Sequence, residues 1–237
     1  IILIGIPLFL IFSQPNLSTT IIVTLIFITL LFIAGLSYKI VLTVLAAAVP
    51  LSIVGIILLV NRVLPLQDYQ YNRILSFIDP EKYSDGFWQQ RNSIMAIGSG
   101  QIWGKGLNTD SINSVKNGNF LSESQTDFIF AIVGEELGFV GCVIVIGLLF
   151  LIVVECIIIA RRAQGMAGRL ICCGVAAWIG FQSFVNICVA TGMMPNTGVP
   201  LPFVSYGLTS IVSLFIGIGI VLNVGLQPRK YGSGDSI

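Results

Sequence analysis

Residues 122–141 read SESQTDFIFAIVGEELGFVG, and they join a polar segment to a long apolar one. They contain four acids, namely Glu123, Asp127, Glu135 and Glu136. The next charged residue is Glu155, which follows an uninterrupted apolar run. A carboxylate at the centre of a bilayer costs about 3 kcal/mol on insertion scales, so membrane chains keep few acids at depth without a use for them. The stretch therefore predicts a functional site where a membrane helix meets water.

The composition is that of a membrane protein. Hydrophobic residues make up 55% of the 237 residues and charged residues 10%, and the mean hydropathy is +0.95. These values are typical of an all-α polytopic transmembrane bundle and not of a soluble domain. The formal net charge of +1 gives no electrostatic support for a nucleic-acid partner.

Several kinds of catalytic and metal site are excluded by residue type. The chain has no histidine, which excludes Ser-His-Asp and Cys-His hydrolysis and histidine-ligated metals. Its five cysteines lie in apolar runs without the spacing of a metal site, so we expect them to pack in or against membrane helices. The chain begins at Ile1 in an apolar run without a leader pattern, and we expect it to be the C-terminal part of a longer protein.

Hydrophobic runs predict one membrane domain with spans at about residues 1–12, 19–36, 40–61, 126–160, 170–190 and 202–224. Residues 62–125 form a large extracellular loop in this scheme, with short helices expected at 73–78 and 87–97. The span 126–160 is too long for a straight crossing at 1.5 Å per residue. Gly134, Gly138 and Gly141 therefore predict a bend or a close helix contact in its first half.

Basic residues set the orientation of the spans. They follow the second, fourth and sixth spans, at Lys39, at Arg161, Arg162 and Arg169, and at Arg229 and Lys230. Alternating spans place all of them on one side, which the positive-inside rule makes the cytoplasm. The large loop and the acids of residues 122–141 then lie at the outer face.

More than one interpretation of Asp127, Glu135 and Glu136 is open from their positions alone. Asp127, after Thr126, either caps the fourth span or acts as a general base at the boundary between water and membrane. Glu135 and Glu136 are either buried acids bonded to neighbouring polar side chains, or a proton or cation site, or an electrostatic support for a catalytic acid. Helical spacing favours Glu135 over Glu136 for the face of Asp127.

Two loop segments rich in glycine or proline are further candidates for functional sites. Residues 98–106 lack the spacing of a phosphate-binding Walker loop. Lys105, with Arg91 and Lys116, either contacts phosphate or is a solvated charge in a loop whose charges balance. Residues 194–207 combine three prolines and two glycines, which indicates either a cavity-lining backbone or a tight external turn.

Four stretches together resemble one family, the polytopic peptidoglycan polymerases of the shape, elongation, division and sporulation group. They are TDFIFAIVGEELGFVG at 126–141, AIGSGQIWGKGL at 96–107, PNTGVPLPFVSYG at 195–207 and SQPNLST at 13–19, which is similar to the family's QPDLGT. The chain departs from the family pattern at Asn16, Asn119, Ser122, Gln125 and residues 208–210.

The resemblance implies a lipid II glycosyltransferase in the bacterial cytoplasmic membrane. Asp127, as the family's essential acid, would take the proton from an acceptor hydroxyl that attacks the donor's anomeric carbon with inversion, so that undecaprenyl pyrophosphate leaves. Cations would stabilise that leaving group, and Glu135 and Glu136 would support the site. The substrate-binding residues implied are Glu123, Arg91, Lys105, Lys116, Gln89 and Ser205.

The resemblance also bears on cofactors and partners. No residue is assigned as a metal ligand, and a divalent cation, Mg²⁺ or Mn²⁺, stays open as a cofactor. The partners implied are lipid II, an undecaprenyl-linked glycan and a class B penicillin-binding transpeptidase. Two other functions are open from the sequence: a flippase for a lipid-linked sugar, which would also need deep acids and broken helices, and a non-catalytic scaffold for the transpeptidase.

Overall fold

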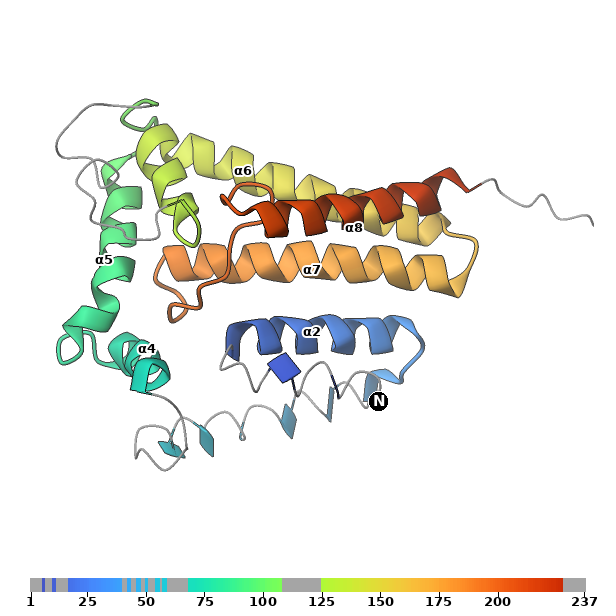
Figure 1. The fold of residues 1–237 in the computed structure, drawn as a ribbon, viewed down its shortest axis with the longest axis horizontal. Coiled ribbons are helices and arrows are strands. Elements are labelled where there is room, and N and C mark those ends of the chain that lie inside the picture. Colours follow the sequence, from blue (N-terminus) through green and yellow to red (C-terminus); the bar gives the residue numbers. More distant parts are fainter. Residues whose placement is uncertain are drawn as a thin grey trace, which may run out of the picture.

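The computed structural model describes residues 17–39, 68–107 and 125–227, with a few separate helical positions among residues 6–11 and 42–58. The spans expected at 1–12 and 40–61 fall largely outside the described residues, as does segment 108–124 with Lys116 and Glu123. The described part consists of helices and turns without strands, as the composition predicts (Figure 1).

Four helices run side by side in a bundle (Figure 1). They are α2 (Leu17–Ile33), α6 (Ile129–Arg162), α7 (Met166–Ala190) and α8 (Leu208–Leu226). Helix α7 contacts each of the other three. Helices α6, α7 and α8 are long and apolar enough to cross a membrane, and α2 is a shorter apolar helix.

Small side chains hold the bundle together. Cys156 and Ala160 on α6 pack against Cys172 and Ala176 on α7 and against Val221 on α8. Small residues let membrane helices approach closely, where dispersion and not water exclusion drives association. All five cysteines are free thiols, four of them buried and Cys173 half-buried, which confirms that they serve packing.

The observed bounds differ most from the sequence prediction at α8. This helix begins at Leu208 and not at Pro202, because the chain first makes a turn at residues 201–206. In that turn the backbone N–H of Ser205 donates to the Leu201 oxygen at 3.0 Å, and Phe203 has a φ of 63°. A left-handed residue cannot lie inside an α-helix, so the helix starts after it.

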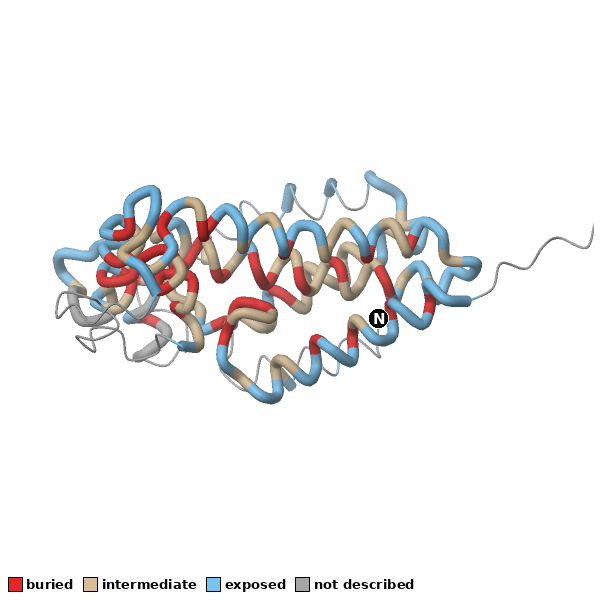
Figure 2. Tube along the Cα trace, turned by 90° about the horizontal axis from the view of Figure 1, so that it is seen from above, coloured by how far each residue is buried: buried red, intermediate tan, exposed pale blue. Residues whose placement is uncertain are grey.

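Two helices lie within the segment expected as a loop. They are α4 (Asp68–Ile78) and α5 (Ser84–Ser99), and they contain the short helices predicted at 73–78 and 87–97. Helix α5 crosses the end of the bundle and contacts both α6 and α7 (Figure 1). Buried residues gather at this end of the molecule (Figure 2). The basic residues Arg161, Arg162 and Arg169 lie at the opposite ends of α6 and α7.

Helix α6 is broken at Gly138, as its glycines and its length predict. Gly138 has a φ of 66° and a ψ of −162°, a backbone conformation that only glycine adopts readily. The 34 residues of α6 would extend about 50 Å if straight, against a bilayer core of about 30 Å. The part after the break runs along the bundle, and the part before it turns towards α5 (Figure 1).

Candidate functional site

The break in α6 is filled by the backbone of a distant segment. In a regular α-helix the N–H groups of Phe139 and Val140 would donate to the carbonyl oxygens four residues earlier. Here they donate to the Gln101 oxygen at 2.8 Å and to the Ile102 oxygen at 3.2 Å. The two amide groups released by Gly138 therefore find their acceptors in the turn that follows α5.

The carbonyl groups on the other side of the break are satisfied by the same turn. The oxygen of Glu135 accepts from the N–H of Lys105 at 2.9 Å, and the oxygen of Glu136 accepts from Gly106 at 3.0 Å. Four hydrogen bonds to residues 101–106 thus replace the two helical bonds that the break removes. Buried backbone groups in a membrane protein need such partners, so the turn and the broken helix form one structural unit.

Glycines make this contact possible. An added Cβ at Gly104 would lie 2.2 Å from the Glu136 oxygen, and one at Gly100 would lie 1.9 Å from the Gly134 oxygen. No side chain fits between backbones that close. The glycines that the sequence singled out in residues 98–106 therefore serve a backbone contact with α6.

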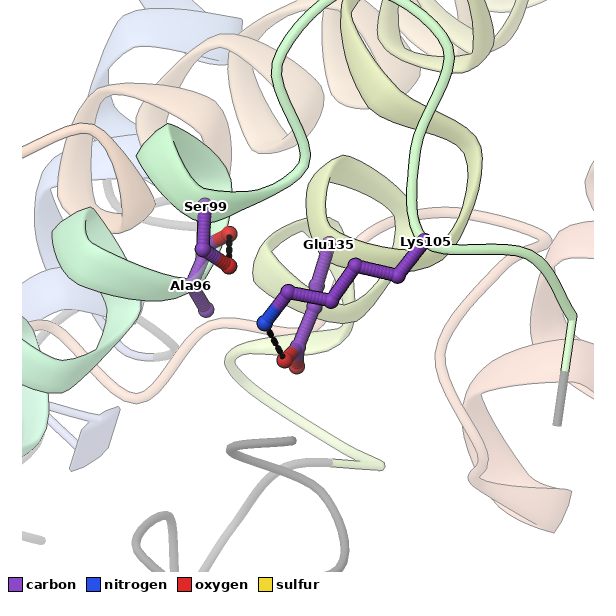
Figure 3. A network of polar contacts seen from close by, with 4 residues as sticks. All are labelled: Ala96, Ser99, Lys105 and Glu135. Atoms are coloured by element: carbon purple, nitrogen blue, oxygen red, sulfur yellow. Dashed lines mark hydrogen bonds and ion pairs between the residues drawn. The ribbon is translucent and has the colours of Figure 1, made fainter. Parts of the chain in front are cut away.

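An ion pair lies on the same contact. The Nζ atom of Lys105 is 2.7 Å from Oε1 of Glu135, whose side chain is only 1% exposed (Figure 3). The Lys105 side chain is 27% exposed. The structure thus joins two residues that the sequence treated separately, and it pairs the buried Glu135 with a lysine of the glycine-rich turn.

Asp127 lies in a turn in which three successive carbonyl oxygens each accept a hydrogen bond. The oxygen of Gln125 accepts from the N–H of Tyr206 at 2.9 Å, and that of Thr126 accepts from Ser205 Oγ at 2.6 Å. The oxygen of Asp127 itself accepts from Asn186 Nδ2 at 2.7 Å. Three bonds from α7 and from residues 205–206 therefore set the position of Asp127.

The start of α6 leaves Asp127 outside the helix. The N-cap position is Phe128 and not Asp127, and the Phe128 side chain makes no cap hydrogen bond. The side chain of Phe128 is fully buried with Ala96 of α5, Ala131 of α6 and Val189 of α7. This anchor fixes the backbone next to Asp127, which is itself half-buried.

Comparison with known proteins decides the family. Residues 1–230 match the sequence model of the cell cycle protein family named for FtsW, RodA and SpoVE. The chain belongs to this family. The match confirms the resemblance drawn from the four motifs, and with the apolar helices it makes the chain a multi-pass protein of the bacterial cell membrane.

Curated relatives carry names from the same family. The chain is 38% identical over 228 residues to the probable peptidoglycan glycosyltransferase FtsW of Haemophilus influenzae, covering 94% of this chain and 55% of that protein. It is 37% identical over 225 residues to the peptidoglycan glycosyltransferase MrdB of Escherichia coli K12, covering 94% and 58%. The chain thus spans a little over half the length of these relatives.

Solved structures share the fold. One, titled "Structural coordination of polymerization and crosslinking by a peptidoglycan synthase complex", has a TM-score of 0.69 and 30% identity over 91% of this chain and 57% of that chain. Another is a mutant of the rod shape determining protein RodA of Thermus thermophilus, with a TM-score of 0.57 and 25% identity over 93% of this chain and 54% of that chain.

In this FtsW/RodA/SpoVE chain, polar side chains of α7 hold the segment 195–207. Gln182 Nε2 donates to the Pro200 oxygen at 2.8 Å, and Asn186 Nδ2 donates to the Val199 oxygen at 2.7 Å. The amide oxygen of Gln182 accepts from Trp178 Nε1 at 2.6 Å. Sequence reasoning missed Gln182 and Asn186. The signal was available, since polar residues four apart in an apolar span share one helix face.

Helix α5 is fastened to the C-terminal end of α7 by buried polar groups. Gln90 Nε2 donates to the Val189 oxygen at 2.9 Å and to the Met194 oxygen at 2.6 Å. Ser93 Oγ donates to the Ala190 oxygen at 2.8 Å. The last carbonyl groups of a helix lack helical partners, and these bonds supply them. Gln90 and Ser93 are further residues that the sequence did not single out.

The other residues expected at the site are distributed as follows. Gln89 Oε1 accepts from Asn196 Nδ2 at 3.2 Å, so it contacts the segment 195–207. Ser205 is 3% exposed, and its hydroxyl both donates to Thr126 and accepts from the Leu201 N–H at 2.7 Å. Arg91 is exposed on α5 and Glu136 is half-buried on α6. Lys116 and Glu123 lie outside the described residues, among which there is no cluster of three or more potential metal-ligating side chains.

Proposed function

We propose that the complete protein is a peptidoglycan glycosyltransferase that polymerises lipid II at the outer face of the cytoplasmic membrane. The names of its relatives support the activity, and those relatives are aligned with this chain over 94% of its length. The observation that carries the proposal is the placement of Asp127. It lies in the turn just before the apolar helix α6. Its backbone oxygen accepts a hydrogen bond from Asn186, and the two preceding carbonyl oxygens accept from residues 205–206.

Asp127 would act as the general base. Its carboxylate takes the proton of an acceptor sugar hydroxyl as the hydroxyl oxygen forms a bond to the anomeric carbon of the donor. The bond from that carbon to the diphosphate breaks, and undecaprenyl pyrophosphate leaves with the electron pair, so the configuration inverts. A positioned base typically contributes about 10²–10⁴-fold to the rate, provided that it is held within hydrogen-bonding reach of the proton.

The leaving diphosphate needs positive charge nearby. Arg91, exposed on α5, and Lys116 are our candidates to supply it. Lys105 is a candidate as well, although its ammonium group also pairs with Glu135. Glu123, Gln89 and Ser205 are the remaining substrate-binding candidates, and Glu135 and Glu136 would act through the backbone unit that they share with residues 105–106. A divalent cation remains an alternative source of charge.

A class B penicillin-binding transpeptidase is the partner that we propose. One of the similar structures belongs, by its title, to a complex that coordinates polymerization with crosslinking. For both activities to act on one glycan strand, the polymerising site must face outward. The opposite placement of α5 and of the basic residues 161, 162 and 169 supports that orientation through the positive-inside rule.

Supplying labelled lipid II to the purified complete protein and its partner separates the candidate functions. Glycan polymer from the wild type, and none from Asp127→Asn, is the result that we expect. The matched control is Glu155→Gln, which removes an acid from the same helix outside the site. Lipid translocation without polymer would favour a flippase. Neither polymer nor translocation from the wild type would favour a scaffold.

A further inference from the structure

Asn186 links the segment of Asp127 to the segment 195–207. Its side-chain nitrogen lies 2.7 Å from the backbone oxygen of Asp127 and 2.7 Å from that of Val199. The residue is 1% exposed. Both neighbours are carbonyl oxygens, so only the nitrogen of the amide can face them, and both of its hydrogens are used.

The bond from Asn186 restrains the backbone of the proposed general base, where a small displacement would affect the reaction rate. The next residue after Asp127 is the buried anchor Phe128, and the preceding carbonyl oxygen is bonded to Ser205. Asn186 adds the bond at Asp127 itself, from a helix that does not contain the acid. A reacting group displaced by about 1 Å can lose about 10²-fold in rate. Removing a bond at the base's own residue is therefore expected to reduce the catalytic step more than substrate binding.

We propose that Asn186 is a positioning residue: it sets the position of Asp127 against the segment 195–207 without touching substrate. This inference rests on the proposed function for its effect on the rate, although the link itself does not. It differs from a general contribution to stability, because Gln182 makes the same kind of bond from the same helix to Pro200, whereas Asn186 bonds to Asp127 itself.

The matched variants are Asn186→Leu, Asn186→Asp and Gln182→Leu in the complete protein. Leucine and aspartate both approximate the shape of asparagine, and neither can donate two hydrogens. We expect kcat for polymerisation to fall by about 10–100-fold in both Asn186 variants with KM little changed. Gln182→Leu should lower the melting temperature to a similar extent but reduce kcat less than either Asn186 variant, because its bond reaches Pro200 and not Asp127.

Hydrogen exchange tests the link independently of activity. Amides of residues 125–131 should exchange faster in Asn186→Leu than in the wild type and in Gln182→Leu. Unchanged exchange in Asn186→Leu would overturn the proposal even if no variant polymerises lipid II. Equal kcat losses in Asn186→Leu and Gln182→Leu would overturn it too, because they would indicate general loosening. A wild type without polymerase activity but with the expected exchange pattern would contradict the proposed function and leave the link supported.

Discussion

Gly138 and Gly104 pack backbone against backbone, with room for no side chain between them. An added Cβ at Gly138 would lie 2.3 Å from the nitrogen of Gly104, and the φ of Gly138 is 66°. Gly138→Ala should therefore destabilise the protein by at least about 1–3 kcal/mol, the usual cost of such a backbone conformation alone. Thermal melting of the complete protein in detergent checks this.

Gly147→Ala is the control for that substitution. Gly147 lies in the same helix, and an added Cβ would meet nothing within 4 Å. Alanine in a helix interior should stabilise by up to about 1 kcal/mol relative to glycine. Equal melting temperatures for the two variants would contradict the view that residues 101–106 are built into α6.

The ion pair between Lys105 and Glu135 should couple the same two segments energetically. Lys105→Met leaves a buried carboxylate without its cation, at a cost of about 2 kcal/mol, below the range for fully buried pairs because Lys105 is 27% exposed. The double variant Lys105→Met with Glu135→Gln should be less destabilised than the sum of the single variants. Additive losses in a double-mutant cycle measured by melting would show that the pair contributes no coupling.

Ser93 should matter to the docking of α5 far more than Ser99. Both hydroxyls donate to a backbone oxygen, but Ser93 bonds to Ala190 of α7, whereas Ser99 bonds to Ala96 of its own helix (Figure 3). Ser93→Ala leaves a helix-terminal carbonyl unsatisfied in a buried site, which costs about 1–3 kcal/mol. Ser99→Ala should be close to neutral. Similar hydrogen-exchange rates for α5 in the two variants would contradict the docking described here.

Much of the fold could be predicted because each membrane helix is marked by a continuous run of apolar residues in the sequence. The apolar runs predicted α6 and α7 to within a few residues, and the length of α6 with its glycines predicted the break. The start of α8 could not be predicted in this way. Pro202 is a favourable first residue of a helix, but the backbone at Phe203 is left-handed and the helix begins only at Leu208.

The candidate site was less predictable, because its bonds join residues far apart in the sequence. Gly138 indicated a bend or a close helix contact, but no local pattern says which backbone approaches it, and the role of Gly100 and Gly104 became visible only in the structure. Asn186 and Gln182 were missed for a different reason. Each is a single polar residue in an apolar span, and only the four-residue spacing between the two shows that they share one helix face.

Thiol labelling checks the orientation of the chain in the membrane. With the native cysteines replaced, Leu107→Cys should react with a membrane-impermeant reagent applied to intact cells, because residue 107 follows the turn at the α5 end of the bundle. Met166→Cys, at the start of α7, should react only after the membrane is opened. The reverse pattern would place the Asp127 turn in the cytoplasm and would be incompatible with polymerisation at the outer face.

The rate at which the complete protein polymerises labelled lipid II, with Asp127 intact and with Asp127→Asn, tests the central claim most directly. Asparagine keeps the shape of the side chain and the backbone bond to Asn186, and removes only the basic oxygen. We predict a loss of about 10²–10⁴-fold in kcat, with Glu155→Gln near the wild-type rate. Polymerisation by a folded Asp127→Asn protein at the rate of the Glu155→Gln control would contradict the assignment of Asp127 as the general base.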